Sequence, residues 1–265
     1  MTPHTPIQHA PPQRSIDLNA DLGEYTGTSG GAHDVAILDV VSSANIACGV
    51  HAGDREVMQR TVDAAASRGV AIGAHPSYAD REGFGRREMT VTPAALLQQI
   101  VSQIEALADC CAKAGTRLRY VKPHGALYNV AARDDSVARV VSEAVRRADP
   151  SLLLLTLAGR ALAREGQRAG LVIASEAFAD RAYLPDGSLL PRDRPGAVLH
   201  DAYDVARRAV SMARDGYVTA VDGVRLQVRP DSLCIHGDNP EALALVKATR
   251  AALEAGGLSI APFAA

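Results

Sequence analysis

The sequence predicts an α/β protein folded as a distorted, seven-stranded (βα) barrel of the TIM-like type. Short apolar runs and longer segments with helical spacing alternate along the chain, as in a parallel sheet whose strands are connected by helices. The apolar runs are continuous, which is typical of strands covered by helices. Most of them end in a histidine, a lysine or an acidic residue. Because all strands of a parallel barrel open at one face, these side chains are expected to converge there.

Seven strands are expected, one at each short apolar run. They lie at 15–20, 44–48, 70–74, 118–121, 152–157, 171–174 and 233–235. Helices are expected near 34–41, 54–67, 92–115, 136–147, 159–168, 202–214 and 239–257. Asp54 and Thr92 are expected N-caps, since their side-chain oxygens can accept a backbone N–H of the first helical turn. Pro93 suits the first helical position and Gly115 the C-terminal end, which predicts a long helix between them.

One barrel domain is expected over residues 15–265, after a disordered N-terminal tail at 1–14. A length of 265 residues is ordinary for one α/β barrel, and 47% apolar residues supply a large core. No GxGxxG motif follows the first expected strand, which argues against a doubly wound, dinucleotide-binding sheet. No linker or low-complexity stretch divides the chain. The sequence therefore predicts a single compact unit.

Composition argues against several classes of partner. A net charge of −2 without any basic run gives no signature of nucleic-acid or anionic-membrane binding. The apolar runs fall far short of the ~20 residues that a membrane helix needs, and the N-terminal residues lack the apolar core of a secretory signal. The four cysteines have no metal or redox spacing. We therefore expect a cytoplasmic protein with neither a membrane nor a nucleic-acid partner.

Acidic and amide side chains crowd the first expected strand and its exit. Asp17, Asn19 and Asp21 alternate along the strand and so face one side of it, which is expected to be the barrel interior. Glu24 follows shortly after. Buried carboxylates are costly unless they are paired, bind a ligand or take part in catalysis. These residues are candidates for a site, and a hydrogen-bonded cluster that only shapes the next loop is the alternative.

Histidines end several other expected strands. His51 follows the second strand, His75 the third, His124 the fourth and His236 the last. Histidines and carboxylates from separate strands can act as general acid and base or bind a divalent metal, for which Asp21, His75 and His124 are the candidate ligands. A single histidine of this kind would be explained by a structural role, such as a hydrogen bond within the core. The set, in equivalent positions, favours a functional site.

Two further features indicate an anion in this site. Lys122 lies at a strand end, where it can bind a phosphate or carboxylate, or form a structural ion pair with a neighbouring acid. The charged loop at 76–89 can act as a lid that brings Arg81, Arg86 or Arg87 over an anion, and an ordinary solvated loop is the alternative. No GxxxxGK[ST] motif is present, so ATP chemistry cannot rest on a P-loop in this chain.

Six motifs, in this order, resemble the LamB/YcsF family. They are IDLNADLGE (16–24), SANIACGVHAGD (43–54), GAHPSYADREGFGRR (73–87), YVKPHGALYN (120–129), EAFADRAYLPDGSLLPR (176–192) with PGAVLHD (195–201), and IHGDNP (235–240). The resemblance covers about residues 15 to 263. It implies a fold similar to the distorted seven-stranded barrel of glycoside hydrolase/deacetylase-like proteins.

The resemblance also implies a reaction. Members of the family form the A subunit of bacterial 5-oxoprolinase, which implies ATP-dependent opening of 5-oxoproline to glutamate together with separate B and C subunits. ATP would be a co-substrate handled chiefly by those partners. This chain would bind the activated ring or hydrolyse it.

Roles in that reaction are hypotheses. The candidate catalytic residues are Asp21, Glu24, His75, Lys122, His124 and His236. The candidate substrate-binding residues are Asn19, Asn45, His51, Asp54, Arg81, Arg86 and Asp238. A histidine paired with a carboxylate would activate the water, and the lysine with an arginine of the loop would hold phosphate or the substrate carboxylate.

Two alternative functions stay open. The chain could be a stand-alone metal-dependent deacetylase or amidohydrolase, with Asp21, His75 and His124 as ligands, which metal analysis would test. It could also be a non-catalytic, substrate-binding subunit. In that case, mutations at the mouth of the barrel would weaken binding or assembly without lowering turnover.

Overall fold

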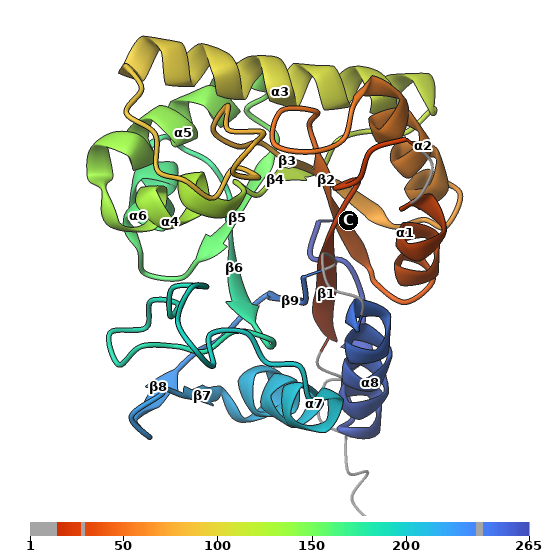
Figure 1. The fold of residues 1–265 in the computed structure, drawn as a ribbon, viewed down its shortest axis with the longest axis vertical. Coiled ribbons are helices and arrows are strands. Elements are labelled where there is room, and N and C mark those ends of the chain that lie inside the picture. The colour runs from red at the N-terminus through yellow and green to blue at the C-terminus, as the bar shows by residue number, and fades with distance from the viewer. Residues whose placement is uncertain (1–14, 28–29, 237–240, 265) are drawn as a thin grey trace, which may run out of the picture.

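The computed structural model describes residues 15–27, 30–236 and 241–264. Seven parallel strands close into a barrel in the order β1-β2-β3-β4-β5-β6-β9, and β9 pairs with both β6 and β1 (Figure 1). The barrel strands are β1 (Ser15–Leu22), β2 (Ser43–Ala47), β3 (Ala71–His75), β4 (Tyr120–Val121), β5 (Leu153–Leu157), β6 (Ile173–Phe178) and β9 (Ser232–Cys234). The predicted seven-stranded barrel is confirmed. The tail predicted at 1–14 lies outside the described residues.

Helices surround the barrel and connect its strands (Figure 1). They are α1 (Gly31–Leu38), α2 (Arg55–Ala66), α3 (Pro93–Lys113), α4 (Gly125–Arg133), α5 (Asp135–Ala148), α6 (Ala161–Arg168), α7 (Ala202–Val210) and α8 (Ala242–Ala255). Asp54 accepts the N–H of Val57 at 2.8 Å, and Thr92 accepts that of Ala95 at 3.4 Å. Both predicted N-caps are therefore confirmed.

Several short elements differ from the sequence-based expectation. Helix α4 lies between β4 and α5, in a segment for which no element was expected. β7 (Tyr217–Thr219) and β8 (Arg225–Gln227) form an antiparallel hairpin outside the barrel, and β10 (Ser259–Ile260) pairs with the start of β1. A π-helical turn (Ser211–Asp215) continues α7. The hairpin strands and β10 are too short to show a hydrophobic period, which is why the sequence does not reveal them.

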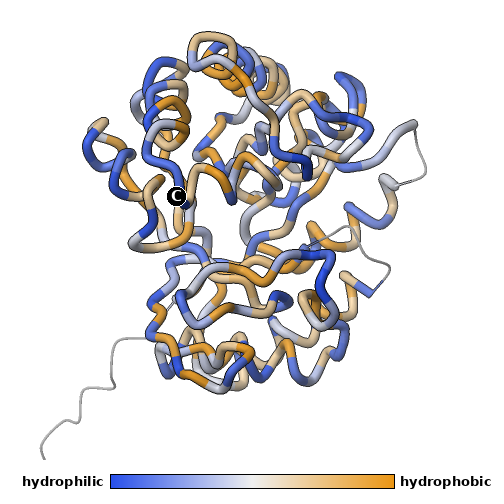
Figure 2. The backbone as a smooth tube through the Cα atoms, turned by 60° about the vertical axis from the view of Figure 1, so that its left-hand side comes forward, coloured by the Kyte–Doolittle hydropathy of each residue, from blue (hydrophilic) through white to orange (hydrophobic). Residues whose placement is uncertain are grey.

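Side chains of β1 alternate between the helices and the barrel interior. Leu18 and Leu22 belong to the main hydrophobic core. Asp17, Asn19 and Asp21 face the interior and are each at most 5% exposed. Figure 2 shows hydrophobic and hydrophilic residues interspersed along the helical segments, as is typical of helices with one apolar face. The expectation that β1 delivers polar groups into the barrel is therefore confirmed.

Residues near the C-terminus fill part of the barrel interior. Phe263 and Ala264 pack with Tyr120, Leu155 and Ala174 in a second, smaller apolar cluster. The rings of Tyr120 and Phe263 meet edge to face at a centroid distance of 4.8 Å. The polar groups of the site therefore lie above an apolar layer inside the same barrel.

Candidate active site

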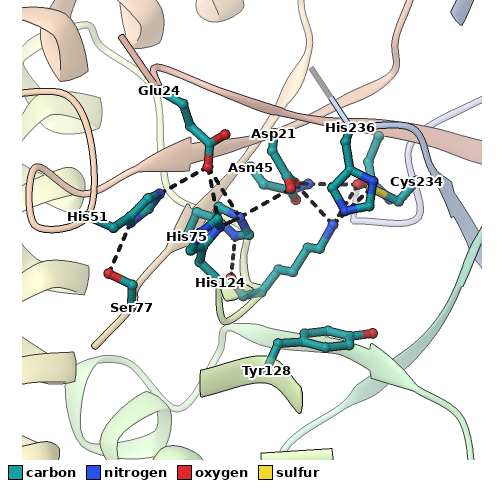
Figure 3. Close-up of polar contacts among 12 residues, drawn as sticks. Asp21, Glu24, Asn45, His51, His75, Ser77, His124, Tyr128, Cys234 and His236 are labelled. Carbon is teal, nitrogen blue, oxygen red and sulfur yellow. Dashed lines mark hydrogen bonds and ion pairs between the residues drawn. The ribbon is translucent and has the colours of Figure 1, made fainter. Parts of the chain in front are cut away.

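The carboxyl ends of the barrel strands bring titratable side chains from distant parts of the sequence together (Figure 3). Asp21 lies near the end of β1 and His75 ends β3, whereas Glu24 and His124 follow β1 and β4. One nitrogen or oxygen atom from each of these four residues lies within 4.8 Å of the others. The three residues predicted as metal ligands therefore form one cluster, together with Glu24.

Backbone carbonyls fix the orientation of two histidines in this cluster. His75 donates its Nδ1–H to the carbonyl of Lys122 at 2.7 Å, and His124 donates its Nε2–H to that of Phe84 at 2.8 Å. The remaining nitrogens, His75 Nε2 and His124 Nδ1, face each other at 2.9 Å. Carbonyls that accept the outer N–H groups are what holds histidine ligands on a metal. The two inner nitrogens are therefore placed to share one proton or to bind one metal ion.

Charge around the cluster favours His75 as the carrier of a shared proton. Burial lowers the pKa of His75, but the carboxylate of Asp21, 3.4 Å from Nε2, raises it above the ordinary value. Burial and the neighbouring imidazoles of His51 and His75 hold the pKa of His124 well below its ordinary value. The pKa values of the two rings are therefore shifted in opposite directions although the rings touch.

Glu24 connects this pair to a third histidine (Figure 3). Its Oε1 lies 3.3 Å from His124 Nδ1 and 3.0 Å from His51 Nε2. The other nitrogen of His51 lies 3.0 Å from the hydroxyl oxygen of Ser77, which in turn donates to the carbonyl of Tyr78. The rings of His51 and His124 stack at a centroid distance of 3.9 Å. His51 therefore contacts two members of the cluster, Glu24 through a polar contact and His124 through ring stacking.

Lys122 lies between two carboxylates inside the barrel. Its ammonium is 3.1 Å from Asp21 Oδ1 and 2.8 Å from Glu176 Oε1. Burial opposes the charge, yet these carboxylates hold the pKa of Lys122 well above its ordinary value. Tyr128 donates its hydroxyl to the other oxygen of Glu176 at 3.0 Å. In this structure the lysine forms the ion pairs that were the alternative to phosphate binding.

Sequence analysis missed Glu176. The strand containing it was expected to end at residue 174, but β6 continues to Phe178, so the carboxylate lies inside the barrel at 3% exposure. A charged residue two positions beyond an apolar run was the available signal. Because side chains alternate along a strand, a residue two positions after Ala174 faces the same side of β6 as Ala174 does.

Asp180 was also missed, and it orients His236. The carboxylate accepts the backbone N–H of His236 at 3.0 Å and its Nδ1–H at 2.9 Å. Burial opposes ionisation, but the contact with His236 holds the pKa of Asp180 below its ordinary value. The imidazole stacks on Phe178 at 5.5 Å. With Nδ1 occupied, Nε2 of His236 is the nitrogen able to accept a proton.

The loop at 76–89 packs closely on the histidines. Gly85 has a φ of +66°, and a Cβ there would lie 2.9 Å from His124 Cδ2 and 3.0 Å from His51 Cβ. The carbonyl of Gly85 accepts the N–H of Ala126 at 2.9 Å. Phe84 itself adopts a φ of +54°, unusual for a residue with a side chain, and so points its carbonyl at His124. A glycine is required here because backbone and imidazole touch.

The three arginines of this loop have different environments. Arg87 forms an ion pair with Asp80. Arg81 donates to the carbonyls of Gly49 and Gly53, at 3.2 and 2.8 Å. Arg86 lies over the ring of Phe84, 4.8 Å from its centroid, and lines the cleft described next. Of the three, Arg86 is therefore the one that the structure places at the candidate site.

A cleft of about 570 Å³ opens above the cluster, within the size range of small-molecule sites. Its inner part includes Asp21, His75, Lys122, His124 and His236. Of the predicted catalytic residues only Glu24 is not part of its lining, since it lies behind the histidines.

Among the described residues predicted to bind substrate, Asn19, Asn45, His51, Asp54 and Arg81 are not part of the cleft lining. Asn45 donates to Asn19 at 2.6 Å and to Asp21 at 2.8 Å, and Asn19 donates to Glu176 at 3.1 Å, so each amide holds one carboxylate inside the barrel. Asp54 caps α2. Asp238 lies outside the described residues. The structure therefore gives the two asparagines and Asp54 supporting contacts.

Almost the whole chain matches one protein family. The model of the LamB/YcsF family matches residues 16–265. The chain belongs to the LamB/YcsF family. It is similar to the A subunit of 5-oxoprolinase from Paracidovorax citrulli, with 52% identity over 249 residues that cover 94% of this chain and 99% of that protein. The resemblance inferred from the motifs is confirmed.

Solved structures support the same assignment. The lactam utilization protein from Thermus thermophilus is similar to this LamB/YcsF protein with a TM-score of 0.88 and 44% identity, covering 94% of this chain and all of that one. A peptidoglycan deacetylase from Bacillus subtilis matches with a TM-score of 0.50 and 12% identity, covering 96% of this chain and 89% of the other. The latter shows likeness in fold alone, and it confirms the predicted deacetylase-like barrel. No helix among the described residues has the length and apolar character needed to span a membrane.

Proposed function

We propose that this LamB/YcsF protein is the A subunit of an ATP-dependent 5-oxoprolinase, which opens the lactam of 5-oxo-L-proline to L-glutamate with subunits B and C. The names of its relatives support the substrate. The observation that carries the chemistry is the cleft in which His236, oriented by Asp180, faces a buried cluster of acids, histidines and Lys122. Four buried free cysteines agree with a cytoplasmic location.

A lactam resists hydrolysis because its nitrogen is a poor leaving group. Transfer of a phosphoryl group from ATP to the amide oxygen would make the ring carbon reactive toward water. Because the chain has no P-loop, subunits B and C would supply this step. The cleft of this chain then has to bind the activated ring, exclude bulk water and direct one water molecule to the carbon.

His236 is suited to move the proton in this step. Asp180 holds its Nδ1–H, so Nε2 can take a proton from the attacking water and return it to the ring nitrogen as the C–N bond breaks, which leaves the γ-carboxyl group as an acyl phosphate. A second water then displaces inorganic phosphate from this acyl phosphate and gives glutamate. Lys122 keeps its positive charge between Asp21 and Glu176 at the base of the cleft. Its ammonium would stabilise negative charge that develops on the substrate oxygen.

The donor set of the histidine cluster fits a divalent metal. Asp21, Glu24, His75 and His124 would hold it, because both imidazoles already donate their outer N–H groups to carbonyls. When bound, such an ion polarises a substrate oxygen and lowers the pKa of a bound water. This same donor set keeps the stand-alone metal-dependent deacetylase or amidohydrolase as a second candidate function.

Glutamate release from 5-oxoproline and ATP tests the proposal. The chain alone, subunits B and C alone, and all three together are compared, with His236→Gln as the site variant and Arg146→Gln, on the outer face of α5, as its control. We expect activity only in the full mixture, lost with His236→Gln and kept with Arg146→Gln. Absence of activity with folded partners would overturn the proposal. ATP-independent amide hydrolysis that chelation abolishes would establish the second candidate.

A further inference from the structure

The cleft has two ends of opposite chemical character. Its inner end contains the carboxylates and histidines described above. Its outer end is lined by five arginines, Arg86, Arg133, Arg160, Arg181 and Arg192. They come from segments far apart in the sequence, among them the loop at 76–89 and the region after β6. Arg133 pairs with Glu88, Arg160 lies 4.0 Å from Asp186, and Asp193 also lines the cleft, so the arginines outnumber the acidic residues of this lining but are partly balanced by them.

Arg181 is the most unusual of these arginines because it is buried. Its exposure is 4%, and its guanidinium donates to the carbonyls of Ala197 and Leu190, at 3.2 and 2.6 Å. Across the described ranges no carboxylate forms an ion pair with it, and the carboxylate of its neighbour Asp180 is bonded to His236. The charge of Asp180 stabilises the guanidinium at longer range, but its hydrogen bonds go to neutral carbonyls alone, and a buried guanidinium without a directly bonded carboxylate is suited to receive an anion.

Two further guanidiniums add positive charge at this point. Burial, followed by the nearby charge of Arg192, lowers the pKa of Arg181 to about 10, and Arg86 acts in the same direction. A ligand of opposite charge that binds near these guanidiniums is attracted by all three. Leu190, whose carbonyl Arg181 holds, lies two residues before Arg192, so the buried arginine also positions the segment of its neighbour.

We infer that the arginine end of the cleft is a subsite for a phosphoryl group, with Arg181 as its buried anchor and Arg86 and Arg192 at its rim. Guanidiniums suit this ligand because their planar N–H groups match phosphate oxygens in pairs. Lys122 is less suited, since two carboxylates already surround its ammonium. The subsite thus separates phosphate recognition from the proton transfer at His236.

The size of the cleft agrees with a ligand larger than 5-oxoproline. A volume of about 570 Å³ is in the range that holds drug-sized molecules, whereas 5-oxoproline is a single small ring with one carboxylate. The activated lactam carries a phosphoryl group as well. The identification of the anion as a phosphoryl group rests on the proposed function. The expected binding of inorganic phosphate to the isolated chain is independent of that function.

Calorimetric titration of the folded chain with inorganic phosphate tests the subsite. We expect phosphate to bind the wild type, and to bind Arg192→Gln about tenfold more weakly, as loss of one charge-assisted contact implies. Arg146→Gln removes the same charge from the outer face of α5 and should bind as the wild type does. Arg181→Lys, which keeps the charge but not the paired N–H groups, should also weaken binding. Arg181 donates to two carbonyls, so the fold itself can depend on it. If Arg181→Lys does not fold, Arg192→Gln decides the test.

A second titration, with saturating 5-oxoproline present, identifies the anion. Simultaneous binding of both ligands supports a phosphoryl subsite distinct from the place of the ring. Displacement of phosphate by 5-oxoproline would show that the arginines hold the substrate carboxylate and would overturn the inference. Equal phosphate affinity in wild type, Arg192→Gln and Arg146→Gln would overturn it as well. These measurements need no turnover, so failure of the proposed function in the reconstituted mixture would be recognised separately.

Discussion

Replacement of Lys122 by methionine should reveal how strongly its charge holds the barrel interior together. The ammonium lies 3.1 Å from Asp21 and 2.8 Å from Glu176, and all three residues are at most 5% exposed. At an effective dielectric constant of about 20, each contact corresponds to roughly 5 to 6 kcal/mol of Coulomb energy before desolvation is subtracted. Methionine keeps most of the volume but leaves two buried carboxylates without their shared cation. Removal of one partner from a buried ion pair typically costs about 3–5 kcal/mol.

Urea denaturation at neutral pH gives the free energy of unfolding for a double-mutant cycle. We expect Lys122→Met to lose about 3–5 kcal/mol. Glu176→Gln should lose less, because the lysine keeps Asp21 as a partner. The double variant should be more stable than Lys122→Met alone, since one of the unpaired charges is gone. A loss below about 1 kcal/mol for Lys122→Met, within the range of surface ion pairs, would refute this reasoning. A double variant no more stable than the single one would refute it too.

Three further predictions concern other parts of the molecule. Burial raises the pKa of Asp17 to about 6 from an ordinary 3.8, so its contribution to stability is complete below pH 4 and is lost as the pH rises through 6. Between pH 4 and 7 the wild type should therefore lose up to about 3 kcal/mol more unfolding free energy than Asp17→Asn, and equal slopes in urea titrations would contradict this. Gly85→Ala should lower turnover at least tenfold through displacement of His124, whereas Gly69→Ala, at a similar φ with open space around it, should affect stability alone. Asp180→Asn should lower kcat and shift its pH profile with little change in KM, and an unchanged profile would show that His236 does not need this partner.

Strand positions were predictable because helices cover this parallel sheet. Each barrel strand is then a continuous apolar run, and the alternation of Asp17, Asn19 and Asp21 could be interpreted once a barrel was assumed. The same rule failed at β6. A strand was expected to end before the first charged residue that follows its apolar run. Glu176 is nevertheless buried within β6, where Lys122 neutralises it. The length of β6 thus depends on a partner that belongs to a different strand end, far earlier in the chain.

A site residue was predictable from the sequence where it lies at the end of an expected strand. The histidines at strand ends and Asp21 do converge, as the barrel requires. Contacts between loops were not predictable. The pairing of Asp180 with His236 spans 56 positions, and the position of Arg181 depends on carbonyls of a segment without regular structure. Such contacts are set by tertiary packing, for which the sequence carries no local period.

Closure of the barrel by β9 against β1 has a consequence for the order in which the chain is made. Asp17 pairs in register with Ser232, so the first strand leaves the ribosome 215 residues before this neighbour does. Until then β1 has one unpaired edge, and Asp17 lacks the serine that later donates to it. Domains with such distant pairings fold slowly and expose unpaired strand edges while they wait. Translation speed and chaperone supply should therefore affect the soluble yield of this protein.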